Sequence, residues 1–128
     1  MAVEIIEIYS KKEDIEKITS LLEKYSFQDL EKHCHFEFSV MEKLTDIELI
    51  SRIFKRFELI KTIELRENDK KERYYSLNYE IEDGTFVSLA IVLRQNKKPL
   101  LINAIHASKN YRHFEKSLRK NYGDKFLV

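Results

Sequence analysis

The side chains in this sequence that are best suited to acid–base chemistry near neutral pH are four histidines. They lie in two pairs, His33 with His35 and His106 with His113. His106 ends an apolar, strand-like run and directly precedes a basic segment. Rigid strand ends beside open loops often hold reacting or phosphate-contacting imidazoles. His106 is therefore a candidate catalytic residue, with a capping or partly buried histidine as the alternative.

The spacing of His33 and His35 suits a metal site only if both lie on a strand. A strand would aim the two imidazoles to one side and would offer Glu37 as a third ligand. A helix would turn them about 200° apart, which makes joint ligation awkward. Because a helix is favoured here, we predict no metal ligands and expect separate surface or packing roles for these histidines.

Arg73 and several tyrosines have side chains that suit nucleic acid. A guanidinium fits two phosphate oxygens, although Arg73 could equally pair with Glu72 or Glu64 on the surface. Tyrosines stack on bases where they are exposed. The candidates are Tyr74, Tyr75, Tyr79, Tyr111 and Tyr122. At strand and helix spacing, most of these should belong to a core or its rim.

No strong catalytic motif is present. The sequence has no phosphate-binding glycine loop, no nucleophile elbow, no Cys-x-x-Cys and no His-Glu-x-x-His. We therefore predict no cofactor.

A sheet must position the candidate residues. Four apolar-rich runs separated by polar turns predict a four-stranded antiparallel meander: Leu59–Arg66, Arg73–Ile81, Thr85–Arg94 and Leu100–His106. The Asp83-Gly84 step is a strong hairpin signal. Alternation gives the first two runs an apolar face and a polar face. The apolar face carries Ile63, Leu65, Leu77 and Tyr79, and the other face carries Thr62, Glu64, Ser76, Asn78 and Glu80.

About three helices are expected before the sheet, which makes the fold class α+β. A short strand at Ala2–Tyr9 precedes a helix over about residues 11–25, opened by a capping box that begins at Ser10. Capping signatures at Ser26-Phe27-Gln28-Asp29 and Thr45-Asp46-Ile47-Glu48 predict helices over about residues 27–43 and 46–57. Residues 33–40 also alternate as a strand would, so both structures stay open there.

A basic helix is expected over about residues 110–121, with Gly123 placed to end it. Residues 94–128 carry nine Lys or Arg against two acids, a net charge of +7, and residues 1–93 carry 14 against 20, a net charge of −6. This division hints at a polyanion partner for the C-terminal part. A solvated helix beside a turn would give the same composition.

Length and composition indicate one compact domain. The 128 residues contain one Pro and two Gly, and no low-complexity tract. The N-terminus lacks the features of a signal peptide, no run is long enough to span a bilayer, and the lone Cys34 cannot form an internal disulfide. We expect a cytoplasmic protein. A charged fraction of 35% with only two Gln suits a heat-adapted source.

Several residues carry a family resemblance over about residues 30–106. They are His35, Thr45-Asp46-Ile47-Glu48, Phe57-Glu58-Leu59-Ile60, Arg73 and Asp83-Gly84. Their order, with a histidine in a helix, a second helix and a four-stranded antiparallel meander, resembles the small RNase toxins of the barnase, EndoU, colicin and RelE group.

The resemblance implies metal-independent cleavage of RNA, in which the ribose 2′-hydroxyl attacks the adjacent phosphate. It implies that His35 and His106 share the roles of base and acid and that Arg73 clamps the phosphate. The basic helix would steer the RNA with Lys109, Arg112, Lys116, Arg119 and Lys120. Two features depart from the group: the added N-terminal strand and helix, and the acidic first 93 residues.

The alternative function is a non-catalytic interaction domain, either immunity-like or inhibitor-like, or an oligomeric subunit. An acidic first part with a basic end suits a charge-complementary protein partner, such as an antitoxin or a second copy, as well as RNA. Small-ligand binding on the concave face of the sheet is a third class, for which the sequence carries no ligand signature.

Overall fold

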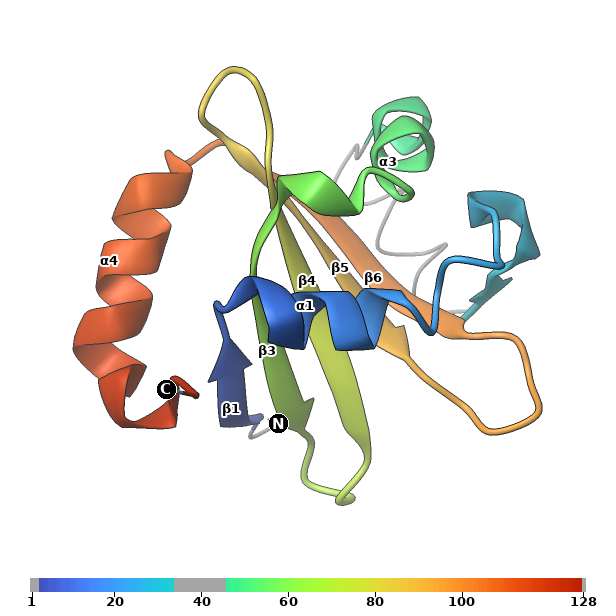
Figure 1. Cartoon of the computed structure of the whole chain (residues 1–128), viewed down its shortest axis with the longest axis horizontal. Coiled ribbons are helices and arrows are strands. Elements are labelled where there is room, and N and C mark those ends of the chain that lie inside the picture. Colours follow the sequence, from blue (N-terminus) through green and yellow to red (C-terminus); the bar gives the residue numbers. More distant parts are fainter. Residues whose placement is uncertain (1–2, 34–45, 128) are drawn as a thin grey trace.

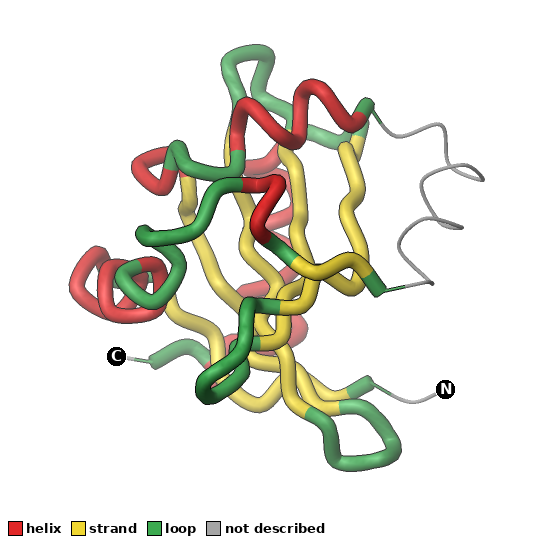
Figure 2. Tube along the Cα trace, turned by 90° about the vertical axis from the view of Figure 1, so that its right-hand side faces the viewer, coloured by secondary structure: helices red, strands yellow, loops and turns green. Residues whose placement is uncertain are grey.

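The computed structural model describes residues 3–33 and 46–127. Within these residues, three α-helices accompany a six-stranded mixed sheet (Figure 1), which confirms the α+β class. The strand order across the sheet is β1-β3-β4-β5-β6-β2. The strands are β1 (Glu4–Tyr9), β2 (Glu31–Lys32), β3 (Ile60–Glu67), β4 (Arg73–Glu80), β5 (Phe86–Val92) and β6 (Leu100–Ala107). Figure 2 shows from the side how these strands twist.

The predicted meander forms the centre of the sheet. Strands β3 to β6 pair antiparallel in chain order, and their ends lie within two residues of the predicted runs. The β4–β5 hairpin turns at Gly84, which has a φ of +86° and donates its N–H to the carbonyl of Ile81 at 2.9 Å. Glycine adopts this left-handed conformation without the steric cost of a Cβ. The hairpin predicted at Asp83-Gly84 is therefore confirmed.

The sheet is wider than the four strands predicted. Strand β1 pairs antiparallel with β3, and β2 pairs parallel with β6. The prediction of a helix over residues 27–43 is wrong for residues 27–33, the part that the structure describes. The capping box at Ser26 and Asp29 does form, but it caps only a 3-10 turn over Phe27–Asp29. The chain then extends, because the Glu31 N–H bonds to the carbonyl of Pro99 at 3.0 Å.

The rest of that predicted helix, including the choice between helix and strand for residues 34–40, lies outside the described residues. His35 and Cys34 lie there as well.

Helix α1 (Lys12–Thr19) is shorter than the predicted helix over residues 11–25. Lys11 occupies the N-cap without a side-chain bond, so the capping box predicted from Ser10 is wrong. At the other end, the hydroxyls of Thr19 and Ser20 bond back to carbonyls one turn earlier. Such side-chain bonds to the backbone compete with helix propagation, and turns follow.

Helices α3 (Ile47–Ile53) and α4 (Tyr111–Tyr122) begin at side-chain caps. The Asp46 carboxylate accepts the N–H of Leu49 at 3.2 Å, and the Asn110 amide oxygen accepts the N–H of Arg112 at 2.9 Å. Helix α4 ends at Gly123 as predicted, but Gly123 keeps helical angles, with a φ of −56°, and leads into a 3-10 turn. None of the helices in the described ranges is long and apolar enough to cross a membrane.

The main core lies between one face of the sheet and helices α1 and α3, with α1 crossing in front of the sheet in Figure 1. Ile63, Leu77 and Leu89 on the strands are fully buried there. The Tyr79 hydroxyl donates to the carbonyl of Phe54 at 2.8 Å, and burial raises the pKa of Tyr79. The apolar face predicted from alternation is confirmed.

Helix α4 packs on the opposite face of the sheet. Tyr111 and Phe114 contact the ring of Phe86, with ring centroids 5.8 and 4.4 Å away. Tyr111 and Leu118 are buried. The polar face predicted for β3 and β4 is therefore not open to water, and four of its side chains are buried: Thr62, Glu64, Ser76 and Asn78.

Candidate functional site

Arg73 and His106 lie near opposite ends of the sheet. Arg73 faces Glu67 at the start of β4, whereas His106 is level with Val87, which pairs with Tyr79 near the end of β4. Six residues of strand separate these levels, about 20 Å at about 3.3 Å per residue. The two side chains therefore do not hold a common phosphate, and the phosphate clamp that the resemblance implied is not formed by this pair.

Arg73 instead makes a surface ion pair, the alternative that the sequence left open. Its partner is Glu67, whereas the sequence suggested Glu72 or Glu64. Its Nε lies 3.0 Å from Oε2 of Glu67 across the β3–β4 ladder. The hydrogen bond from Arg73, with the nearby charge of Lys71, holds the pKa of Glu67 below its ordinary value.

His106 forms a chain of hydrogen bonds with the β4–β5 hairpin. Its Nε2 lies 3.0 Å from the Thr85 hydroxyl, and that hydroxyl donates to Oδ1 of Asp83 at 2.5 Å. A threonine hydroxyl has one hydrogen to donate. Because Thr85 gives it to Asp83, Nε2 of His106 must be the protonated nitrogen. Nδ1 is then left as the atom that can accept a proton.

The His106 imidazole points to the face of the sheet opposite α4. Its register partner Val87 belongs to the core cluster beneath α1 and α3, and His106 itself is exposed at the end of that face. The hydrogen bonds from the Thr85 side chain and backbone hold the pKa of Asp83 below its ordinary value, and His106 adds to this effect. The cluster therefore pairs one ionised carboxylate with one oriented imidazole.

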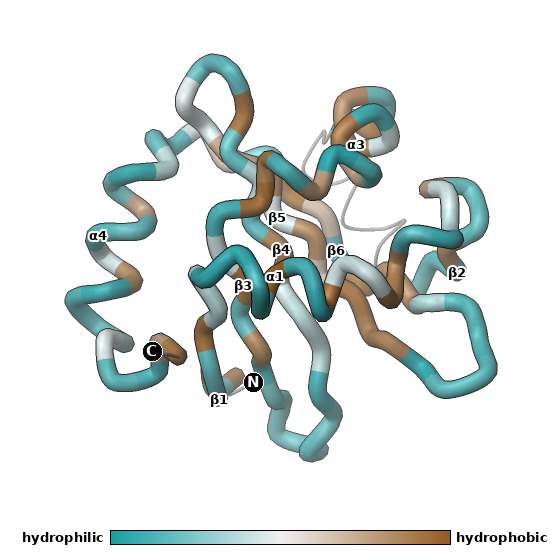
Figure 3. The backbone as a smooth tube through the Cα atoms, viewed as in Figure 1, coloured by the Kyte–Doolittle hydropathy of each residue, from teal (hydrophilic) through white to brown (hydrophobic). Residues whose placement is uncertain are grey.

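The cations predicted to bind RNA are on the outer surface of α4 and beside its N-terminus. We define the α4 basic face as Lys109, Arg112, Lys116 and Lys120. All four are exposed, and none makes an ion pair within residues 3–33 and 46–127. A shallow groove of about 480 Å³ lies on α4 and includes two cations of this face, with the lining Asn110, Arg112, His113, Glu115, Lys116 and Arg119. Figure 3 shows α4 as mostly hydrophilic.

Arg119, the fifth predicted cation, has partners of its own. Its Nε lies 3.0 Å from the Glu115 carboxylate, and its guanidinium lies 4.3 Å from the ring centroid of Phe126. Arg119 therefore fixes the C-terminal turn against α4 and is excluded from the α4 basic face.

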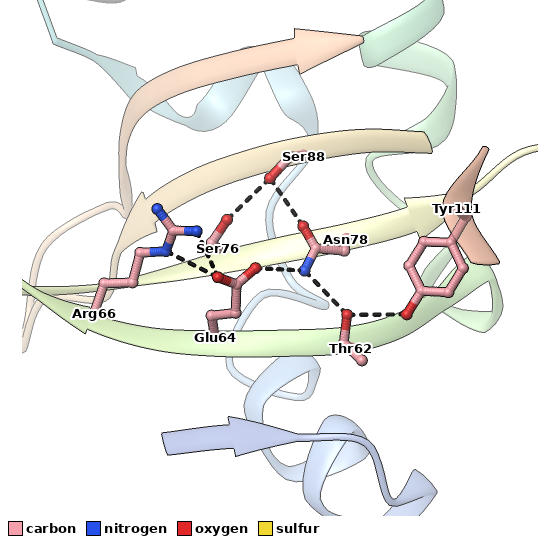
Figure 4. A network of polar contacts seen from close by, with 7 residues as sticks. All are labelled: Thr62, Glu64, Arg66, Ser76, Asn78, Ser88 and Tyr111. Carbon is pink, nitrogen blue, oxygen red and sulfur yellow. Dashed lines mark hydrogen bonds and ion pairs between the residues drawn. The ribbon is translucent and has the colours of Figure 1, made fainter. Parts of the chain in front are cut away.

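A polar network beneath α4 was not predicted from the sequence (Figure 4). Glu64 lies at its centre, with a side chain that is 1% exposed. One carboxylate oxygen accepts from Arg66 Nε at 3.1 Å and from its Nη2, and the other accepts from the Asn78 amide at 2.8 Å. Burial opposes the charge of Arg66, but the Glu64 carboxylate and Tyr74 together raise the pKa of Arg66 above its ordinary value.

The network continues across three strands to α4. The Asn78 amide also donates to the Thr62 hydroxyl at 3.0 Å, and Thr62 bonds to the Tyr111 hydroxyl at 3.1 Å. Ser88 donates to Asn78 Oδ1 at 3.0 Å and bonds to Ser76 at 2.9 Å. Burial raises the pKa of Tyr111. Alternation located four of these residues on one face (Thr62, Glu64, Ser76 and Asn78), but no local signal shows that α4 covers them.

No group of three His, Cys, Asp or Glu side chains suited to a metal ion occurs among the residues that the structure describes. His33 follows β2 directly, while His35 and Glu37 fall outside those residues. A metal site formed by His33, His35 and Glu37 is therefore not tested by the described residues.

Comparison of the chain with protein-family models, with curated proteins and with solved structures finds no match. The assignment of function therefore rests on the geometry of the site.

Proposed function

We propose that this protein binds single-stranded RNA through the α4 basic face. The observation that carries the proposal is the set of four exposed cations that no acidic side chain neutralises in the described part of the chain. Unpaired Lys and Arg release counterions from a phosphate backbone when they bind it, and this release is the main source of sequence-independent affinity.

The geometry of α4 suits an extended strand. Arg112, Lys116 and Lys120 follow one another at intervals of four residues, so they form a row about 12 Å long on the helix surface. Asn110 fixes where this row begins, because it caps the helix. The groove that Arg112 and Lys116 line gives the backbone of the RNA a path along the first part of the row.

RNA cleavage at His106 is the second candidate function. The observation that favours it is the hydrogen-bond chain through Thr85 to Asp83, which leaves Nδ1 as the proton acceptor. A positioned imidazole of this kind can accept or donate the proton of a ribose hydroxyl. His35 remains the proposed partner for the opposite role, as the resemblance implies, and Arg73 has no part in the proposal.

Fluorescence anisotropy with a short labelled RNA tests the binding proposal. The double variant Lys116→Glu with Lys120→Glu should weaken binding by about tenfold or more, since each reversal removes one phosphate contact and adds repulsion. The matched control, Lys12→Glu with Lys17→Glu on α1, makes the same change in net charge and should have a much smaller effect. Equal losses in the two variants would contradict the proposal.

Cleavage is tested on the same RNA by gel electrophoresis. His106→Ala should abolish cleavage and leave the affinity for RNA unchanged, because His106 does not line the α4 groove. If the unaltered protein binds RNA without cutting it, the cleavage candidate is wrong. A protein that binds no RNA but copurifies with another chain would favour the interaction domain.

A further inference from the structure

A pocket of about 220 Å³ opens between the inner side of α4 and the β1–β3 edge of the sheet. Its apolar lining comes from Val3 and Ile5 at the sheet edge and from Phe114, Leu118 and Tyr122 on α4. Two of these side chains are exposed: Val3 at 43% and Tyr122 at 40%. The pocket therefore offers apolar and aromatic surface to a ligand.

The size of the pocket suits a single planar ring system. A cavity of about 150 Å³ in a protein interior holds a benzene molecule. A space of about 220 Å³ is therefore large enough for one heterocycle.

The polar side of the pocket carries no net charge. Glu64 and Arg66 both line it, and the Glu64 carboxylate neutralises the charge of the Arg66 guanidinium. The Arg66 side chain is 31% exposed, so it is partly open to the pocket. A phosphate would gain little there, because the buried carboxylate repels it. A guanidinium plane still stacks on a base and donates hydrogen bonds to it. The floor thus favours a neutral planar group over an anion.

The pocket adjoins the α4 basic face along the helix. Ser117 and Asn121 line the pocket and are hydrogen-bonded to each other at 3.3 Å, one turn apart. The neighbouring row of the helix surface carries Lys116 and Lys120. An RNA strand whose phosphates contact these lysines can therefore place one base past Ser117 and Asn121 into the pocket.

We infer that this pocket takes one unstacked base of the bound RNA. The inference rests on the proposed function, because α4 must hold the backbone for the base to enter. The apolar and aromatic lining stacks on the ring, and Arg66, Ser117 and Asn121 supply hydrogen bonds to its edge. Arg66 and the pocket thereby bind the base, and this adds to the affinity that α4 has for the phosphates.

The test compares a short single-stranded RNA with an abasic oligonucleotide that has the same number of phosphates. The unaltered protein should bind the RNA about fivefold more tightly or better, the gain expected for one stacked base. Ser117→Leu with Asn121→Leu should fill the pocket without adding an aromatic ring, since both positions are exposed and leucine suits a helix. This variant should bind the two ligands equally.

The matched control is Gln28→Leu with Gln95→Leu, two exposed positions outside α4 and the pocket. It should keep the preference for RNA. Equal affinity of the unaltered protein for both oligonucleotides would overturn the base pocket and leave phosphate binding by α4 intact. A filled-pocket variant that keeps the full preference would overturn it as well. Absence of binding to either ligand would overturn the proposed function itself.

Discussion

At the scale of single residues, the Thr85 hydroxyl determines the state of both its neighbours. It donates its hydrogen to Asp83 and accepts one from His106. The carboxylate is stabilised by this bond, so the pKa of Asp83 lies below its ordinary value. A lowered folded-state pKa stabilises the fold above the unfolded pKa of about 3.9, and this contribution is lost as the pH falls through the folded-state value.

Thr85→Val should therefore raise the pKa of Asp83 toward its ordinary value. It should also let the neutral His106 ring carry its proton on either nitrogen. The backbone N–H of Thr85 also bonds to Asp83, so part of the shift should persist. NMR titration of the Asp83 carboxyl and the His106 ring nitrogens measures both effects. Thr85→Ser keeps the hydroxyl and should behave as the unaltered protein. An unchanged imidazole tautomer in Thr85→Val would contradict the proposed hydrogen-bond chain.

Glu64 is the residue on which the network beneath α4 depends. Its removal takes the carboxylate acceptor from the half-buried Arg66 and one of two acceptors from the buried Asn78 amide, which keeps its bond to Thr62. Glu64→Ala should lower the free energy of unfolding by about 1–3 kcal/mol, between the values for surface pairs and for fully buried pairs.

Urea denaturation measures this loss against a matched surface pair. Arg73→Ala breaks the pair with Glu67, in which the Arg73 side chain is 57% exposed, and should cost about 0–1 kcal/mol. If the two variants lose the same stability, the network does not stabilise the fold.

The sequence located His106 at a strand end and the polar side chains of β3 and β4 on one face. Both conclusions depend only on local periodicity. The partners of these residues lie far along the chain, as Thr62 and Tyr111 do, and no local pattern reports such a contact. Arg73 pairs with Glu67 and not with the Glu72 or Glu64 that the sequence suggested, because the register of the β3–β4 hairpin places Arg73 opposite Glu67.

At the scale of elements, two glycines at the ends of secondary structure have opposite roles. Gly84 has a positive φ, and a Cβ added there would lie 3.3 Å from the Asn110 amide nitrogen. Gly123 has helical angles, and nothing lies within 4 Å of an added Cβ. The hairpin thus requires glycine, whereas the end of α4 does not.

Gly84→Ala should destabilise the fold by about 1–2 kcal/mol, the cost of a left-handed conformation for a residue with a Cβ. Gly123→Ala should stabilise it by about 0.4–1 kcal/mol, because alanine loses less backbone entropy on folding. Thermal denaturation of the two variants gives the sign of each effect. A stabilising Gly84→Ala would show that the hairpin does not depend on the conformation of Gly84, and a destabilising Gly123→Ala would show that the end of α4 does depend on glycine.

Strands were predicted more reliably than helices because of where their partners lie. The meander joins neighbours along the chain, so apolar runs and turn residues are enough to indicate it. The segment after Asp29 becomes β2 because it pairs with β6, about seventy residues later. A correct capping box at Ser26 therefore led to a wrong helix, since the tertiary pairing outweighed the local signal.

At the scale of the whole molecule, the sheet separates the two candidate sites. The α4 basic face and the base pocket lie on one side, and the His106 cluster lies at the end of the other side. RNA bound on α4 must therefore pass around the end of the sheet to reach His106. The hairpin at Gly84, which accepts the N–H of Tyr111 at 2.7 Å, joins the two sides at that end.

The salt dependence of RNA binding tests the central claim most directly. Binding by all four cations of the α4 basic face predicts a slope of log affinity against log salt of about −3, at about −0.7 for each phosphate contact. Lys116→Ala with Lys120→Ala should reduce the magnitude of this slope by about 1.4, and Lys12→Ala with Lys17→Ala should leave it unchanged. A slope that the α4 variant does not alter would contradict the account.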